Sequence, residues 1–136
     1  MKMILYAGVL ILLLTGCMHA NDPRPAQLRA KVVAIADHVC VMVQPEGDEK
    51  IVTVSIAEVG NDNNKLDKYD LAIPPAGSKC VPDFGFVFDV GKSYNFSVIL
   101  ESPEKKGKGR FPAARIYNAG FTLWSNDGKL AVNPLY

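Results

Sequence analysis

Residues 93–102, SYNFSVILES, decide the fold class of this chain. Apolar and polar side chains alternate along them with a period of two, and only Ile99 interrupts the polar set. The apolar set consists of Tyr94, Phe96, Val98 and Leu100. Because successive side chains of a strand point to opposite faces of a sheet, this alternation predicts a half-buried β-strand with one face toward a core.

The same alternation continues in segments on both sides of residues 93–102. The expected strands are residues 28–36, 38–44, 51–59, 84–90, 93–101 and 115–125, with weaker candidates at 69–73 and 130–132. Turn-forming clusters separate them at residues 45–49, 60–64, 74–78, 89–93, 102–109 and 125–129. Short strands with frequent turns and no sustained helical spacing predict one all-β domain, residues 28–136, with an antiparallel, immunoglobulin-like β-sandwich.

Residues 89–94, DVGKSY, resemble the tyrosine corner of such sandwiches, in which the tyrosine hydroxyl bonds back to the preceding turn. True immunoglobulin domains have a cysteine two residues after that tyrosine, whereas Phe96 occupies this position here. The single tryptophan, Trp124, lies outside the interval between Cys40 and Cys80. We therefore expect an immunoglobulin-like shape with its own disulfide placement.

Residues 1–16 have the composition of a signal peptide. One lysine precedes an apolar run of about a dozen residues, which is shorter than the roughly 20 that a helix needs to cross a bilayer. Small residues follow the run, as they do at signal cleavage sites. The alternative is a buried first helix, but the run lacks polar residues at helical spacing. The sequence therefore predicts export.

The tetrad Leu14-Thr15-Gly16-Cys17 resembles the lipobox of bacterial lipoproteins, which implies cleavage before Cys17 and attachment of lipid to it. Ordinary cleavage near Ala20 is the alternative. Residues 17–27 contain two prolines and no apolar period, which predicts a lipidated tether. Met18 is not the aspartate that retains lipoproteins at the inner membrane in enteric-type bacteria. The resemblance thus implies a periplasmic protein on the inner leaflet of the outer membrane.

The other two cysteines are Cys40 and Cys80. Export places them where thiols oxidise, and with Cys17 acylated they are the only possible pair. Such a disulfide could contribute about 4 kcal/mol by restricting the unfolded chain. His38 and these two cysteines do not have the spacing of a zinc site, so no metal and no cofactor are predicted.

The signs of charge are segregated along a chain that is close to neutral overall. Residues 46–70 have a net charge of −4 and residues 104–115 a net charge of +4. Neutrality argues against nucleic acid as a partner, because phosphate binding needs a basic field. Charged blocks are usually solvated loops, but they can also steer a protein partner. The candidate contact residues are Asp62, Asp67 and Asp70 in the acidic loop and Lys105, Lys106, Lys108 and Arg110 in the basic hairpin.

No assembled catalytic motif is visible. Residues 91–93, GKS, end like a Walker A loop, but the glycine that this loop needs is replaced by Phe86. Residues 60–70 are rich in oxygen ligands, yet they lack the central glycine and terminal glutamate of an EF-hand loop and are expected to form a polar hairpin. We therefore predict that the protein is not an enzyme.

The whole layout resembles a family of small bacterial proteins, the type VI secretion immunity periplasmic lipoproteins. The matching segments are LLLTGC (12–17), HVCVMV (38–43), residues 79–102 and KKGKGRFPAARIY (105–117). The resemblance implies a periplasmic lipoprotein that binds and neutralises an effector toxin by covering its active site, without fixing which toxin. The basic hairpin is the preferred contact surface, because its cations are not expected to pair within the loop. The alternative is an envelope accessory lipoprotein that scaffolds a secretion or surface assembly.

Overall fold

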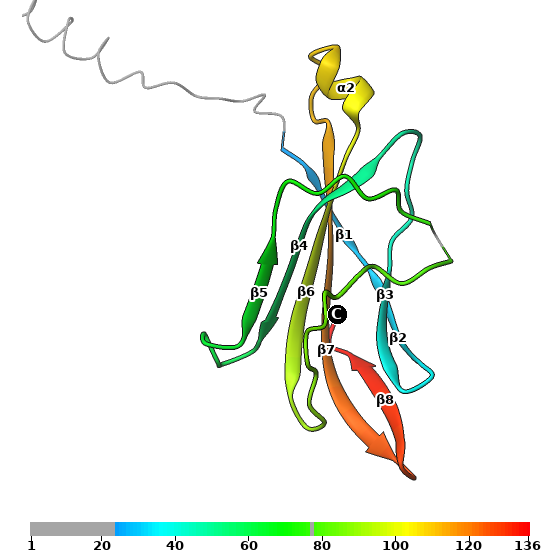
Figure 1. Ribbon diagram of the computed structural model, residues 1–136, viewed down its shortest axis with the longest axis vertical. Coiled ribbons are helices and arrows are strands. Elements are labelled where there is room, and N and C mark those ends of the chain that lie inside the picture. The colour runs from blue at the N-terminus through cyan, green and yellow to red at the C-terminus, as the bar shows by residue number, and fades with distance from the viewer. Residues whose placement is uncertain (1–23, 77) are drawn as a thin grey trace, which may run out of the picture.

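Strand β6 (Ser93–Glu101) is formed by the alternating segment and lies in the middle of a six-stranded sheet (Figure 1). The computed structural model describes residues 24–76 and 78–136. The four predicted apolar residues of β6 are all buried, so the period of two identified the core face correctly. Strand β4 (Lys50–Glu58) pairs with one side of β6 and β7 (Ala114–Asn126) with the other, both antiparallel. Strand β5 (Lys65–Lys68) pairs with β4 at the edge.

The long strand β7 carries two partners on its outer side. Strand β8 (Lys129–Pro134) runs antiparallel to its second half. Strand β1 (Ala26–Arg29) runs parallel to its first half, which the predicted antiparallel pattern did not include. Because β1 begins at Ala26, the last two residues of the predicted tether belong to the sheet. The predicted signal peptide and the lipidation site, Cys17, lie outside the described residues.

A smaller layer covers the apolar face of this sheet. It consists of the hairpin of β2 (Lys31–Ile35) and β3 (His38–Met42). Residues 28–36 were expected to form one strand, but the chain leaves β1 at Ala30, whose amide donates to Asn118, and crosses to the second layer. Val32, Val41 and Val43 of the smaller layer join the buried cluster of β4, β6 and β7. The predicted all-β sandwich is thereby confirmed.

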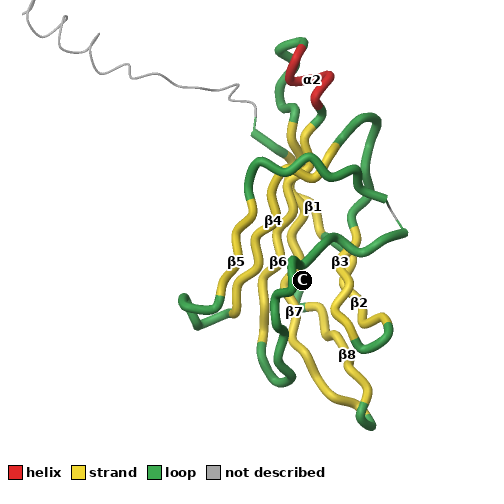
Figure 2. Tube along the Cα trace, viewed as in Figure 1, coloured by secondary structure: helices red, strands yellow, loops and turns green. Residues whose placement is uncertain are grey.

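The segment 84–90 is a loop and not the predicted strand (Figure 2). Phe84 and Gly85 have positive φ angles of 54° and 77°, which a strand cannot contain. Phe86 and Phe88 nevertheless contact the ring of Tyr94 edge-on, with centroids 5.8 and 5.0 Å away. Phe86 and Phe88 of this alternating segment therefore pack their aromatic rings on the core, but the segment does not pair with a neighbouring strand.

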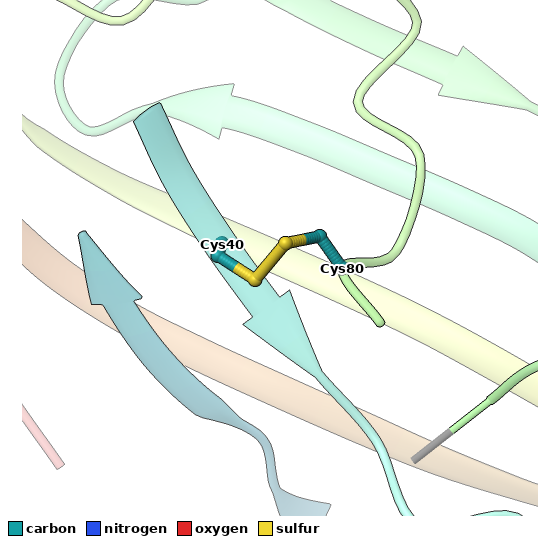
Figure 3. The surroundings of a disulfide bond; sticks show 2 residues. All are labelled: Cys40 and Cys80. Atoms are coloured by element: carbon teal, nitrogen blue, oxygen red, sulfur yellow. A yellow bond between two sulfur atoms is a disulfide. The ribbon is translucent and has the colours of Figure 1, made fainter. Parts of the chain in front are cut away.

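The predicted tyrosine corner is present. The amide of Asp89 donates to the hydroxyl of the fully buried Tyr94, with a distance of 2.7 Å. The predicted disulfide is present as well, and it joins Cys40 on β3 to Cys80 in the long loop before β6 (Figure 3). Cys40 is completely buried and the next loop residue, Val81, donates its amide to Val41. The bridge thus attaches this loop to the smaller layer.

Residues 102–109 were expected to form a turn, and they contain a short helix, α2 (Pro103–Gly107). Ser102 provides the N-cap and Pro103 the first helical position, which are preferred places for both residue types. Five residues are too few to show a helical period, so the sequence pattern could not identify it. Across residues 24–76 and 78–136, no helix is long and apolar enough to span a membrane.

Candidate interaction surface

Helix α2 projects from one end of the sandwich, between β6 and β7 (Figure 1). The hydroxyl of Ser102 accepts from the amide of Lys105 at 3.2 Å and donates to Asp48 in the loop between β3 and β4. The other carboxylate oxygen of Asp48 accepts from the amide of Glu104 at 2.8 Å. These hydrogen bonds lower the pKa of Asp48, the bond from Ser102 most strongly. Because so short a helix is unstable by itself, these tertiary contacts fix the projection.

An ion pair between Glu49 and Arg115 lies beneath α2. Arg115 donates from Nε to Glu49 Oε2 at 2.8 Å and from Nη2 to the carbonyl of Gln44 at 2.7 Å. The hydroxyl of Tyr117 donates to the same carbonyl at 3.1 Å. Burial raises the pKa of Glu49, but the bonds from Arg115 and from the amide of Glu46 outweigh burial and leave that pKa below its ordinary value. Glu49 in turn raises the pKa of Arg115.

The two segments of opposite charge therefore meet in the folded molecule. The start of the acidic block, residues 46–49, packs against Ser102 and against Glu104 and Arg115 of the basic block. Within the basic block, Lys106 pairs with Glu101 at 3.1 Å and Lys108 pairs with Glu104 at 2.8 Å. The expectation that these cations do not pair locally is wrong for Lys106 and Lys108, because the turn of α2 brings them within reach of Glu101 at the end of β6 and of Glu104.

Lys105 and Arg110 form no ion pair with any other described residue. Phe111 follows Arg110 directly, and its side chain is 61% exposed. We call these three residues the α2 tip. Arginine and aromatic residues are common among the residues that dominate protein interfaces, and here a rigid loop presents both. Lys105 and Arg110 are thus the cations of the predicted basic surface that remain available to a partner, and Phe111 adds an exposed ring beside them.

The predicted acidic residues are spread along the edge of the sheet at β5. Asp62 lies in the turn between β4 and β5, Asp67 on β5, and Asp70 beyond the end of β5. Two lysines, Lys65 and Lys68, alternate with them along the strand. This distribution gives no concentrated negative field.

The polar turn between β4 and β5 is held in place by hydrogen bonds to Glu58. The side-chain amides of Asn61 and Asn64 donate to Glu58 Oε2 at 2.6 and 3.5 Å. Lys92 pairs with the other oxygen of Glu58 at 2.8 Å. The bonds from Lys92 and Asn61 lower the pKa of Glu58. In residues 24–76 and 78–136, no three His, Cys, Asp or Glu side chains group as ligands for a metal ion.

A shallow cleft separates α2 from the end of β5. Its volume is about 440 Å³, and Tyr69, Asp70, Glu101 and Lys106 line it. Tyr69 is 64% exposed, so its ring is not part of the hydrophobic core. Sequence reasoning missed both Tyr69 and Phe111. One sequence signal could have identified both residues as exposed. Each is an aromatic residue with charged or proline neighbours, and each lies outside the strongly alternating segments that are expected to face the core.

The family described as "Domain of unknown function (DUF7480)" matches residues 27–126. The chain belongs to this family. The match extends from β1 to the end of β7, so the DUF7480 domain contains the disulfide, the tyrosine corner and helix α2 with its cap. No curated protein and no solved structure is significantly similar to the chain.

Proposed function

We propose that this DUF7480 protein is a lipid-anchored periplasmic immunity protein that binds and neutralises a type VI secretion effector toxin. The observation that carries the proposal is the α2 tip, a projection held by Asp48, Ser102 and the ion pair of Glu49 with Arg115. A projection that is ordered before binding loses little conformational entropy when it enters a cleft of its target. Such an element suits stoichiometric occlusion of an active site.

The position of β1 relative to α2 supports an anchored arrangement. Ala26, the first residue of β1, pairs with Arg115 at the beginning of β7, which is the end that carries α2. Arg24 is the seventh residue after Cys17, and an extended chain spans at most about 3.5 Å per residue. Lipid on Cys17 would thus keep Arg24, and with it the end of the domain that carries α2, close to the membrane, with Arg24 within roughly 25 Å of Cys17. Tethering of this kind raises the local concentration of an inhibitor where the toxin arrives.

The anchor has its own test. The variant Cys17→Ser should lose acyl labelling and accumulate as an unprocessed precursor. Normal processing and membrane retention of this variant would contradict lipid attachment at Cys17.

Immunity is tested by competition between strains. A deletion strain should be killed by its parent, and a periplasmic copy of the protein should restore survival. A copy with Arg110→Glu and Phe111→Ala should protect at least about tenfold less well, because each change removes an exposed anchor of the tip. The matched control carries Lys129→Glu and Val87→Ala, which alter an exposed cation and an exposed apolar residue outside the α2 tip.

A third variant decides between the two charged candidates. Reversal of Asp62, Asp67 and Asp70 to lysine should leave protection unchanged if the α2 tip is the contact surface. Loss of protection in this variant alone would place the contact on the β5 edge. Survival of the deletion strain equal to that of the complemented strain would reject immunity and favour the envelope scaffold.

A further inference from the structure

The second layer leaves one face of the six-stranded sheet open. The β2–β3 hairpin and the loop through Val81 pack on the face that carries Tyr94 and Phe96. The side chains between those residues, such as Asn95, point to the opposite face. No described segment forms a second layer there. We call this surface the open face.

The strand registers assemble three rows of residues on this face. Asn95 of β6 lies beside Gly120 of β7. In the next row, Ser93, Thr122 and Asn133 lie side by side on β6, β7 and β8. Trp124 lies beside Ala131 in the third row. The hydroxyls of Ser93 and Thr122 are 2.7 Å apart, which holds the middle row in a defined orientation.

Two aromatic rings flank the middle row. Trp124 is 52% exposed, and strand alternation places its side chain on the same face as that of Thr122. At the other side, the ring of Tyr136 lies over Gly120, where a β-carbon would come within 2.2 Å of it. The hydroxyl of Tyr136 donates to Asn95 Oδ1 at 3.1 Å, which fixes the ring. Gly120 and Trp124 are about 13 Å apart along the strand.

The chemistry of these rows matches an uncharged sugar chain. Hydroxyl and amide side chains both donate and accept, as sugar hydroxyls require. The faces of aromatic rings carry partial negative charge and attract the C–H groups on the flat side of a pyranose ring. None of the residues that β6, β7 and β8 contribute to the three rows is charged. Lys65 of β5 continues the Asn95 row only beyond Ala57 of β4. Two rings about 13 Å apart on one uncovered face fit an extended polymer better than a compact ligand.

We infer that the open face, at Ser93, Asn95, Thr122, Trp124, Asn133 and Tyr136, binds a neutral β-1,4-linked polysaccharide strand. The two rings bracket the chain, and the hydroxyl and amide groups between them bond to its polar edges. This site lies apart from the α2 tip, so the inference stands independently of the proposed function.

The tryptophan gives a direct readout, because the chain contains only one. Purified full-length protein is titrated with soluble oligomers of β-1,4-linked N-acetylglucosamine and, separately, of β-1,4-linked glucose. Sugar bound against Trp124 should shift its emission and protect it from acrylamide quenching. A response to the N-acetylglucosamine oligomers alone assigns recognition to the acetamido groups, and a response to both assigns it to the sugar ring. An unchanged emission with both series overturns the inference.

Co-sedimentation with insoluble chitin and cellulose tests the individual residues. Trp124→Ala and Tyr136→Ala should each lower the retained fraction at least tenfold. The control Phe111→Ala removes an exposed aromatic residue of the α2 tip and should be retained like the native protein. All variants change exposed side chains and should melt within a few degrees of the native protein. Equal retention of the native protein and both open-face variants would also overturn the inference.

Discussion

Glu49 shows how a single residue can stabilise the fold without being visible in the strand pattern. Its side chain is only 4% exposed, and both of its oxygens accept from Arg115. A buried carboxylate is unfavourable unless it is paired and hydrogen-bonded. Here the pairing also connects the loop before β4 to the start of β7, so one ion pair fixes two segments that are distant in sequence.

The variant Glu49→Gln should lower the free energy of unfolding by about 2 kcal/mol at neutral pH, because Arg115 loses its charged partner. The pKa of Glu49 is lowered in the folded state from an ordinary value of 4.5. Its contribution is therefore complete above that value and is lost as the pH falls through the lower, folded-state pKa. Urea unfolding from pH 7 to pH 3 should show the native protein and the variant converging in acid. A constant difference at every pH would contradict this role.

Gly120 is a second position where one residue decides local structure. The variant Gly120→Ala should displace the Tyr136 ring, because the new methyl group would occupy the space of ring carbons. Tyr136 is 47% exposed, so the stability cost should stay below about 1 kcal/mol. NMR spectra should show a shift of the Asn95 side-chain amide as the bond from Tyr136 is lost. Unchanged Asn95 signals would contradict the packing of Tyr136 on this glycine.

At the scale of elements, helix α2 depends on its cap. The variant Ser102→Ala removes the acceptor for the Lys105 amide and the donor to Asp48. The expected loss of stability is about 1 kcal/mol, and it should be concentrated in the helix. Hydrogen exchange should accelerate at Lys105 and Lys106 while the amides of β6 stay protected. Ser125→Ala, at an exposed serine near the end of β7, serves as the control and should leave α2 unchanged.

At the scale of the whole molecule, the disulfide connects the smaller layer to the loop that caps the core. Replacing Cys40 and Cys80 by alanine should lower the free energy of unfolding by about 4 kcal/mol, since their separation of 40 residues gives a large unfolded-state loop. Urea titration of the native protein with and without reductant measures the same effect. The alanine variant should be insensitive to reductant, and a midpoint equal to that of the oxidised native protein would contradict the prediction.

The sequence by itself determined the fold class, the core face of β6, the tyrosine corner and the disulfide pairing. These features depend on local alternation or on the small number of cysteines, and both are readable along the chain. The same local alternation led to a wrong prediction of a strand at residues 84–90. Alternating phenylalanines there satisfied the period of two, but positive φ angles at Phe84 and Gly85 prevented a strand.

Only the tertiary structure decided which charges are available to a partner. The sequence separates an acidic from a basic block, but folding brings Asp48 and Glu49 against Ser102 and Arg115. These partners are more than fifty residues apart in the sequence, and they meet only when β4, β6 and β7 pair in the sheet. No local sequence pattern encodes that pairing. The same holds for the open face, because the rows around Thr122 exist only once β6, β7 and β8 adopt their registers.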